Sequence, residues 1–547
     1  MKLYFIPFAK YDMVKENYDG TLVIPKHIKL RYLYTCLDEY QRILILNSLK
    51  GGLFFYDIKN EVIEQLNLDN GYAFKDAVGL GIFKNYIVLF SKNKNKILFC
   101  NKRTYKIVME LNLNHINVDS LFVKKDLLYL MNIDENILYI FRLNDYDISF
   151  VNCFRLAKGI GNTSIYVDEQ FIYITDNEEN LLRCYDGKGN LLWECITPFI
   201  DPIGQIWINK DVFILYGGLV NEVGYENKCW QEQKPFFHKL NFKVEENDLY
   251  TLTKSNAFNV TFFYKEEFFT PPDFLPAKIK LAIPTSNVNQ KVNSINFLGV
   301  NGKIIEEKQR KNFFLYELSA LNNNTIGIGY VANIDLQSIK YTIKNPDLFK
   351  LNDKVILSPD DIVLYEAKDE FFDKFVIDEK INDLDKVLKL RNIIFEKLYY
   401  KLNKEARSYK EILEYGYGTC GDYATLILIL LYKNNITCES ATGYKIPKFY
   451  ISQSGIYSIY YNHTWIEIFD QNMNPYPFET SSDDKSYNNR FCEGQFLGLD
   501  WSHIKLYSGP AIPNLIQILD TPKKVSPFDY FRKAQVFAKI NDEVDLF

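Results

Sequence analysis

The sequence predicts a multidomain protein rich in β-structure, with a repeat domain over residues 1–248, a β-sandwich over 249–348 and an α+β domain with a C-terminal extension over 349–547. Three observations predict this division. A strand–turn–strand unit recurs in the first part, strands without that period follow, and helical spacing then precedes a last block of strands. A chain of 547 residues is also too long for one ordinary core, so about two to four domains are expected.

The N-terminal repeats each consist of an apolar strand, a polar turn and a second apolar strand, and they recur every roughly 40 to 45 residues. Four clear copies and a weaker fifth lie at 42–57, 85–101, 126–142, 170–186 and 211–242. Short strands at this period are typical of a β-propeller, in which each repeat buries its faces against its neighbours. We expect six blades, the sixth combining N-terminal strands such as LYFIPF with later ones. The alternative is a β-sandwich with accidental regularity.

The second and third parts differ in pattern. Apolar strands such as NVTFFY and KIKLAIP, within residues 250–345, lack the earlier period and predict a separate small β-sandwich. Residues 385–433 show helical spacing, and from about 438 the chain returns to alternating strands. A helical block followed by antiparallel strands predicts an α+β arrangement.

Composition and charge exclude several classes of function. Aromatic residues make up 16% of the chain, which favours sheet. The net charge is -5 and no Lys/Arg block occurs, so we expect no nucleic-acid partner. The longest strongly apolar run, 424–432, is too short to cross a bilayer, and the N-terminus lacks the pattern of a signal peptide. We therefore expect a cytoplasmic protein without a membrane span, and the abundance of Lys, Asn and Ile favours an AT-rich bacterial genome.

The nine cysteines form no dense framework, so reduced thiols are expected rather than disulfides. Neither CxxC nor HExxH occurs, and the five histidines are dispersed. We therefore expect neither a metal nor another cofactor.

The first candidate for chemistry is Cys420, in the segment YGYGTCGDYATLILILLYKNN. The apolar run after it predicts a buried helix that begins at this cysteine. The positive end of a helix favours thiolate over thiol, and its free N–H groups can receive an oxyanion. A buried structural cysteine is the alternative for any cysteine taken alone. Gly416, Gly418 and Gly421 also match GxGxxG, but a helix rather than a strand is expected before them, which excludes a dinucleotide site.

A histidine and an acid follow in suitable strands. His463 lies in the alternating strand YNHTWIEIFD, and after the turn signal DQNMN a second strand, PYPFETS, carries Glu479. In an antiparallel hairpin these two residues fall on the same face, opposite or diagonal to each other. The carboxylate can then accept the imidazole N–H and fix the tautomer that meets Cys420. Asp470, in the turn, is the competing acid, and a packed or surface role is the alternative for the histidine.

At these residues the sequence resembles a known family. GTCGDYA, NHTWIEIF and PFETS resemble the three motifs of the transglutaminase-like superfamily, which has a papain-like cysteine amidase or peptidase fold. KLRNIIFEKLYYKL resembles the helix before the cysteine in bacterial members, and KIKLAIPTSNVNQKVNSINF resembles the β-sandwich that leads into many of them. The likeness covers residues 255–482 approximately.

The resemblance implies a catalytic triad of Cys420, His463 and Glu479, with glutamate where the family usually has aspartate. It also implies that Tyr399 or Tyr400 donates to the oxyanion and that Trp465 walls the site.

The implied reaction is attack of the cysteine thiolate on a carboxamide or peptide carbonyl, giving a thioester that water or a second amine resolves. We expect hydrolysis of a protein or peptide substrate, with the propeller as the recognition platform for a protein partner. An acyl-transferring transglutaminase or ligase and a non-catalytic binding scaffold are the alternatives.

Overall fold

A computed structural model describes the chain in segments. The described residues are 4–5, 33–37, 43–48, 51–57, 62–66, 74–113, 116–145, 147–156, 162–176, 179–197, 203–209, 211–217, 235–267, 277–299, 302–307, 311–318, 327–354, 366–378, 380–401, 408–446, 456–459, 462–481, 493–509, 514–519 and 534–547. They divide into two compact units, Met1–Asn241 and Phe242–Phe547. The boundary between the units lies close to the predicted end of the repeat domain at residue 248.

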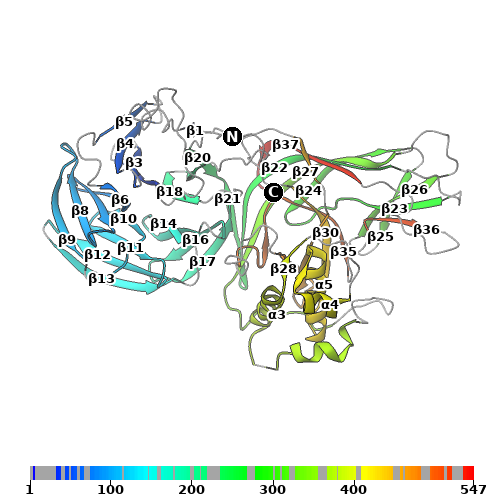
Figure 1. Cartoon of the computed structure of the whole chain (residues 1–547). Coiled ribbons are helices and arrows are strands. Elements are labelled where there is room, and N and C mark those ends of the chain that lie inside the picture. The colour runs from blue at the N-terminus through cyan, green and yellow to red at the C-terminus, as the bar shows by residue number, and fades with distance from the viewer. Residues whose placement is uncertain are drawn as a thin grey trace. The chain divides into compact units, whose positions relative to one another are not determined.

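The described part of the first unit contains five antiparallel sheets of four strands each (Figure 1). The first two sheets comprise β2 (Leu33–Leu37), β3 (Ile43–Asn47), β4 (Gly52–Asp57) and β5 (Val62–Gln65), then β6 (Ala77–Phe83), β7 (Tyr86–Ser91), β8 (Lys96–Asn101) and β9 (Ile107–Asn112). The next two comprise β10 (Ser120–Lys124), β11 (Leu127–Asn132), β12 (Ile137–Leu143) and β13 (Ile148–Arg155), then β14 (Asn162–Val167), β15 (Phe171–Asp176), β16 (Leu181–Asp186) and β17 (Leu191–Ile196). The fifth comprises β18 (Ile203–Asn209), β19 (Asp211–Gly217), β20 (Pro235–Leu240) and β1 (Tyr4–Phe5).

The five sheets close into a ring, which is the arrangement of a β-propeller. The first strands of successive sheets, β2, β6, β10, β14 and β18, contact one another in that order, and β18 contacts β2 again. Glycines permit the close approach of β6 to β10. A Cβ added at Gly79 would lie 2.3 Å from the Cβ of Leu121, and one at Gly81 would lie 2.5 Å from Val123 Cγ2. Larger side chains at these two positions would therefore separate the strands.

The described residues give five blades rather than the six that we expected. Each predicted repeat supplies the two central strands of a sheet in the first four cases, and the weaker fifth copy supplies β19 and β20. The N-terminal segment LYFIPF, assigned to a sixth blade, contains β1, which pairs with β20 and completes the fifth sheet. The fifth blade thus combines a strand from the start of the repeat region with three strands from its end, and this pairing closes the ring.

The second unit contains two sheets that share one apolar core. In the larger, seven-stranded sheet the long strands β22 (Tyr250–Glu267) and β27 (Gly327–Ile343) pair along their whole length. The other strands of this sheet are β21 (Phe242–Glu246), β24 (Gln290–Leu298), β31 (Ile456–Ser458), β34 (Gly498–Leu499) and β37 (Gln535–Val544). The smaller sheet has the order β25 (Gly302–Glu307), β26 (Lys311–Leu318), β23 (Ala277–Ala282), β36 (Ile516–Leu519). Phe258 and Val260 of the larger sheet belong to the same buried cluster as Ile279 and Phe314 of the smaller one.

Strands from the C-terminal part of the chain complete both sheets. β37 pairs with β22, and β36 pairs with β23. The region expected to form a separate β-sandwich, 249–348, therefore shares its sheets with strands that follow the helical region. A domain boundary at residues 348 and 349 stays a prediction.

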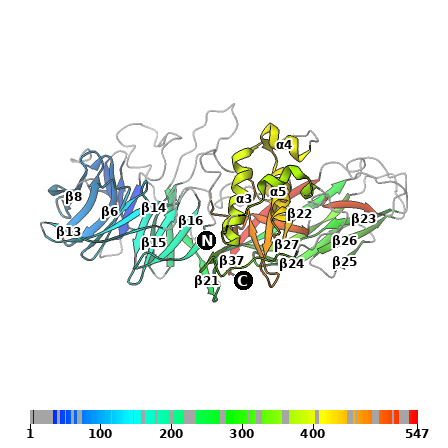
Figure 2. The same cartoon turned by 90° about the horizontal axis from the view of Figure 1, so that it is seen from below.

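The motifs around Cys420, His463 and Glu479 lie in a helical region and in a further four-stranded sheet. The helical region consists of η3 (Glu370–Phe375), α3 (Asp383–Lys397), α4 (Tyr409–Tyr415) and α5 (Cys420–Lys433). The short parallel strands β28 (Tyr399–Tyr400) and β29 (Tyr417–Gly418) lie in the connections between these helices. The sheet has the order β33 (Pro475–Phe478), β32 (Asn462–Phe469), β30 (Cys438–Lys445), β35 (His503–Gly509). Figures 1 and 2 show α3, α4 and α5 gathered on one side of the long strands β22 and β27.

Helix α5 is the centre of this region. Its side chains from Tyr423 to Tyr432 are all buried, and it contacts α3, β30 and β32. An apolar surface on every side keeps the helix in the core, which fixes its first residue against the sheet. Among the helices that the structure describes, none is long and apolar enough to cross a membrane.

Candidate active site

Cys420 is the first residue of α5, as its sequence context predicts. Helix α4 ends at Tyr415 and is capped by Gly416, whose φ of 73° is left-handed, and β29 then leads into the new helix. Thr419 and Asp422 form a capping box, in which the Thr419 side chain accepts from Asp422 N–H and the Asp422 carboxylate accepts from Thr419 N–H. This cap sets the direction in which the helix begins, and therefore where the thiol projects.

The thiol lies against the start of β32. Cys420 is partly exposed, and its Sγ is 3.8 Å from the carbonyl oxygen of Asn462. The next residue, His463, is buried, and its imidazole is within hydrogen-bonding reach of the Cys420 thiol. A reagent can thus reach the sulfur while the imidazole beside it is shielded from water.

Strands β32 and β33 form an antiparallel hairpin that brings His463 and Glu479 together. Ile466 lies opposite Phe478, and Glu479 follows directly after β33. The Nε2 atom of His463 is 2.8 Å from Oε2 of Glu479. Since Nε2 faces the carboxylate, Nδ1 is the ring nitrogen left for the thiol.

The Glu479 carboxylate is held at both oxygens. Oε1 accepts hydrogen bonds from the backbone N–H groups of Thr480, at 2.9 Å, and Ser481, at 3.1 Å. Oε2 accepts from His463, and the Lys445 ammonium lies 4.0 Å from it. Each of these neighbours is a donor or a cation, as the ionised form of the carboxyl group requires.

Asp470, the competing acid, has its partners in the turn of the hairpin. Its carboxylate accepts from the backbone N–H groups of Asn472 and Asn474, from the Asn474 amide and from the Tyr476 hydroxyl. These contacts organise the turn between β32 and β33. The geometry therefore favours Glu479 as the partner of the imidazole.

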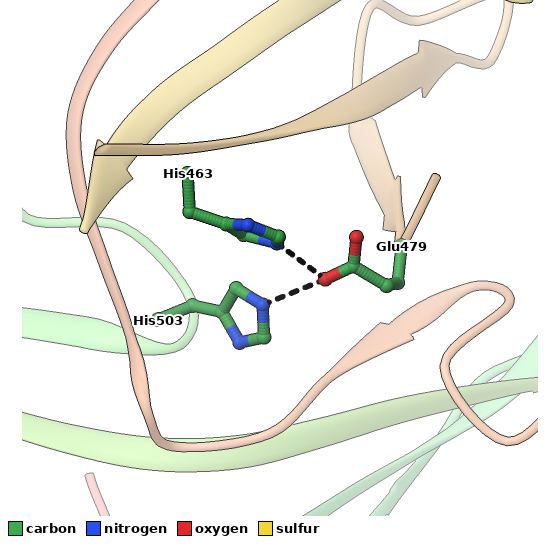
Figure 3. A group of neighbouring side chains, drawn as sticks. All are labelled: His463, Glu479 and His503. Atoms are coloured by element: carbon green, nitrogen blue, oxygen red, sulfur yellow. Dashed lines mark hydrogen bonds and ion pairs between the residues drawn. The ribbon is translucent and has the colours of Figure 1, made fainter. Parts of the chain in front are cut away.

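His503 and Asp500 join the cluster, and sequence reasoning missed both. His503 is the first residue of β35, and its Nε2 atom is 2.9 Å from Oε2 of Glu479. Figure 3 shows the two imidazoles directed at the same carboxylate oxygen. The Nδ1 atom of His503 is 3.1 Å from Oδ1 of Asp500. A histidine at the start of an alternating strand, three residues after an aspartate, is the one signal that the sequence offered.

The electrostatics of the cluster follow from burial and from these pairs. Burial by itself would lower the pKa of His463, but the Glu479 charge and the hydrogen bonds to Cys420 and Glu479 raise it well above its usual value. Burial would raise the pKa of Glu479, yet His463, Lys445 and His503 hold it well below its usual value. The pKa of His503 is raised against the effect of burial by Asp500 and Glu479. The pairs thus favour imidazolium and carboxylate forms over neutral ones.

His463, Glu479 and His503 also have the donor types that a metal ion uses, and their ligand atoms lie within 4.8 Å of one another. Ligands at about 2.0–2.2 Å in a tetrahedral zinc site would be separated from one another by roughly 3.3–3.6 Å. The N to O distances of 2.8 and 2.9 Å are instead those of charge-assisted hydrogen bonds. The geometry therefore fits protons shared between these groups better than a metal ion.

The remaining predicted residues are a tryptophan on β32 and the two tyrosines of β28. Trp465 is buried, and its ring lies 6.2 Å from that of His463 and 5.2 Å from that of His503. Its indole Nε1 is buried without a hydrogen-bond acceptor within the described part of the chain. Tyr399 and Tyr400 form β28, beside the strand that leads to Cys420; Tyr399 is exposed, whereas Tyr400 packs against the core around α5. Donation by either tyrosine to an oxyanion stays a prediction.

A thiol at the start of a buried helix, an imidazole on the adjoining strand and a carboxylate behind it form the arrangement used by cysteine hydrolases and acyltransferases of the papain-like type. Residues 374–480 match the family model of the transglutaminase-like superfamily, and this range contains all three groups. The second unit thus contains a transglutaminase-like core.

Solved structures give weaker likenesses. A candidate cysteine protease from Cytophaga hutchinsonii is similar over 54% of this chain and 94% of that one, with 15% identity and a TM-score of 0.35. Myxococcus xanthus glutaminyl cyclase is similar over 40% of this chain and 96% of that one, with 9% identity and a TM-score of 0.29. A β-propeller domain from Myceliophteria thermophila is similar over 41% of this chain and 79% of that one, with 9% identity and a TM-score of 0.24. A comparison with curated proteins gave no match.

Proposed function

We propose that this protein is a cysteine hydrolase that cleaves an amide bond of a protein or peptide substrate through a thioester intermediate. The observation that carries the proposal is the continuous series of contacts from Cys420 through His463 to Glu479. The family match over residues 374–480 supports the same class of chemistry.

In the first half of the reaction, the Cys420 thiolate attacks the carbonyl carbon and a C–S bond forms. The C–N bond then breaks, and the His463 imidazolium gives its Nδ1 proton to the leaving amine. Glu479 keeps His463 oriented and stabilises its charged form, because the carboxylate accepts a hydrogen bond from Nε2–H while the proton stays on the imidazole.

In the second half, water attacks the thioester carbon, and neutral His463 accepts a proton from that water. The C–S bond breaks, which releases a carboxylic acid and restores the thiolate–imidazolium pair. Attack by a second amine in place of water would transfer the acyl group instead, and the same residues would serve a transglutaminase.

The oxyanion needs donors on the side of α5. The first N–H groups of a helix have no partner within that helix, and the capping box uses only that of Asp422. The N–H of Cys420 is thus in position to bind the developing negative charge. We assign the second donor to Tyr399 or Tyr400, which lie beside β29.

The propeller is proposed as a platform for a protein partner, because propellers commonly present the connections between their strands to binding partners. We propose a cytoplasmic location, in keeping with a reduced nucleophilic thiol.

Alkylation of the full chain by iodoacetamide near neutral pH tests the nucleophile. Cys153 is an internal control, because its side chain is exposed on the propeller strand β13. Among the buried cysteines, burial raises the pKa of Cys100 and Cys184 to about 12, so both should react slowly. We expect Cys420 to be modified at least tenfold faster than Cys153, as read by peptide mass spectrometry.

His463→Ala should remove the preference for Cys420 and leave the rate at Cys153 unchanged. Slow labelling of Cys420 at the rate of Cys153 in the unmodified chain would contradict a cysteine hydrolase and support a binding scaffold. A peptide amide that gives both an acyl-enzyme mass at Cys420 and free amine would then identify the reaction.

A further inference from the structure

The Glu479 carboxylate has two imidazole partners, whereas the proposed reaction uses one. His463 and His503 approach the same oxygen, Oε2, at 2.8 and 2.9 Å (Figure 3). His503 is fully buried, so its ring nitrogens are shielded from bulk solvent. A second buried imidazole at this distance must affect the pKa of His463. The direction of that effect depends on the protonation state of His503.

The partners of His503 determine that state. Its Nε2 atom faces Glu479 Oε2, and its Nδ1 atom faces Asp500 Oδ1 at 3.1 Å and the Asp500 carbonyl oxygen at 3.3 Å. Both ring nitrogens thus face oxygen atoms. An imidazole donates at both nitrogens only when it is an imidazolium.

The other contacts of the two carboxylates come from donors. Oε1 of Glu479 accepts from two backbone N–H groups. Oδ1 of Asp500 accepts from the N–H and hydroxyl of Ser502, and Oδ2 accepts from the Gln495 amide at 3.0 Å. Donors at these oxygens favour the ionised form of both acids, so the protons between them belong to His503.

We infer that His503 is a positioning residue of the site, held as an imidazolium between Asp500 and Glu479, where it fixes the Glu479 carboxylate and shares its negative charge with His463. The inference rests on the proposed function, because it assigns His503 a role in the reaction that Cys420 begins. The charges then alternate along the series Cys420, His463, Glu479, His503 and Asp500, with the Lys445 ammonium 4.0 Å from Glu479.

Sharing the carboxylate has a consequence for catalysis. If Glu479 interacted with His463 alone, the imidazolium would hold its proton more tightly and release it less readily to the leaving amine. The imidazolium of His503, with its ring 5.4 Å from that of His463, opposes that effect. His503 thus keeps His463 oriented while leaving it acidic enough to donate.

Histidine NMR on the full chain labelled with 15N-histidine tests the protonation state without a substrate. The chain has five histidines, and the signals of His503 are assigned from their loss in His503→Gln. We expect both ring nitrogens of His503 still to be protonated once pH has passed the roughly 6.5 of an unperturbed imidazole. Loss of one proton at or below that pH in the native protein would overturn the inference, whatever the variant does.

The same spectra, recorded on variants, test the effect on His463. The glutamine side chain in His503→Gln would keep one donor for Glu479 but carry no charge, so the midpoint of His463 should move up by about one pH unit. Any peptide substrate should show the alkaline limb of kcat/KM moving with it. Lys505→Gln is the matched control, because it removes a positive charge from the same strand, where Lys505 pairs with Glu467, and should leave the midpoint unchanged.

An unchanged His463 midpoint in folded His503→Gln would refute the positioning role. One equivalent of zinc in the purified full chain, lost in His503→Gln, would refute it as well and assign the cluster to a metal. A doubly protonated His503 together with unselective alkylation of Cys420 would instead count against the proposed function and leave the cluster a structural one.

Discussion

Replacing Glu479 by glutamine changes one oxygen into an amide nitrogen and leaves the shape almost unaltered. In the native site, Oε1 accepts from the N–H groups of Thr480 and Ser481, and Oε2 accepts from His463 and His503. A glutamine has only one acceptor oxygen. Whichever way its amide is turned, its NH2 group faces donors that the carboxylate used to accept.

The magnitude of the effect follows from the burial of these groups. Removing one partner of a buried ion pair costs about 3–5 kcal/mol, because the other charge is left unpaired. With the amide nitrogen toward Nε2, His463 must present a lone pair there and carry its proton on Nδ1, which is the wrong tautomer for a base facing Cys420. The corresponding loss of a correctly oriented tautomer in a serine protease costs roughly 10⁴-fold in kcat. We expect a loss of about 10²- to 10⁴-fold here.

The direction of the pH effect is also determined. Burial lowers the pKa of His463, and Glu479 is the charge that raises it. Glu479→Gln removes the charge that opposes the effect of burial, so His463 becomes neutral at lower pH and the alkaline limb of kcat/KM moves down. His503→Gln should move the alkaline limb to higher pH. Because the two variants shift the limb in opposite directions, the comparison distinguishes loss of a charge from general damage to the site.

Iodoacetamide labelling between pH 5 and 9 measures the effect without a known substrate. The native chain should label Cys420 readily, because His463 lies beside the thiol, whereas Glu479→Gln, which deprives His463 of its orienting carboxylate, should label it about 10²-fold more slowly. Asp470→Asn is the control, because Asp470 makes its contacts in the turn. It should cost about 1 kcal/mol in stability and leave the labelling of Cys420 unchanged. The reverse ranking of the two variants would refute the reasoning and make Asp470 the acid.

Four further outcomes are expected. Cys420→Ser should keep the native unfolding temperature and form no acyl-enzyme detectable by mass spectrometry, since a hydroxyl is much harder to ionise than a thiol. Because the pKa of Glu479 is lowered and those of His463 and His503 are raised, the cluster should stabilise the fold most between about pH 4.5 and 6.5. The stabilisation by the cluster is lost as pH falls through the folded pKa of Glu479 and as pH rises through the folded pKa values of the two histidines. Thermal unfolding measured across this pH range checks the prediction, and an identical pH profile for Glu479→Gln and the native chain would contradict it. Trp465→Phe should fold, because the indole Nε1 has no acceptor in the described residues, but kcat should fall several-fold as the wall of both imidazoles loosens. Limited proteolysis should yield resistant fragments that meet near residues 241–250, and continuous degradation without them would argue against two independent units.

Local periodicity was sufficient to predict much of the fold. The recurring strand pairs identified the propeller sheets, and the apolar run after Cys420 marked a buried helix that begins at that residue. Period-two alternation around His463 and a turn before Glu479 predicted which two side chains share a face. These features are encoded within about 20 consecutive residues, where turn chemistry and side-chain direction determine the pairing.

Pairings between distant segments were not predictable in the same way. β1 completes a sheet with β20, and β37 enters the sheet of β22, although long stretches of chain separate each pair. Nothing in the pattern of a strand states which remote strand it will join, so both the blade number and the extent of the sandwich depended on information that the local sequence lacks. His503 was missed for the same reason, because it reaches Glu479 only through the pairing of β35 with β30.

The register of the hairpin explains how a glutamate can act in the proposed triad, at a position where the resemblance to the family implies an aspartate. Continuing the pairing of β32 with β33 sets Glu479 opposite Trp465 and diagonal to His463. Diagonal neighbours are about 7–8 Å apart, against about 4.5–5.5 Å for directly opposed residues, so the extra methylene of glutamate extends the carboxylate toward the imidazole. The longer side chain also has one more torsion to restrain, and a loosely held acid would orient His463 poorly. Two backbone N–H groups fix one oxygen and His503 fixes the other, which restores the constraint that a shorter side chain would have provided. In the proposed mechanism, Glu479 and His503 therefore act together. The Glu479 side chain is long enough to bring its carboxylate to His463, and His503 restrains that carboxylate.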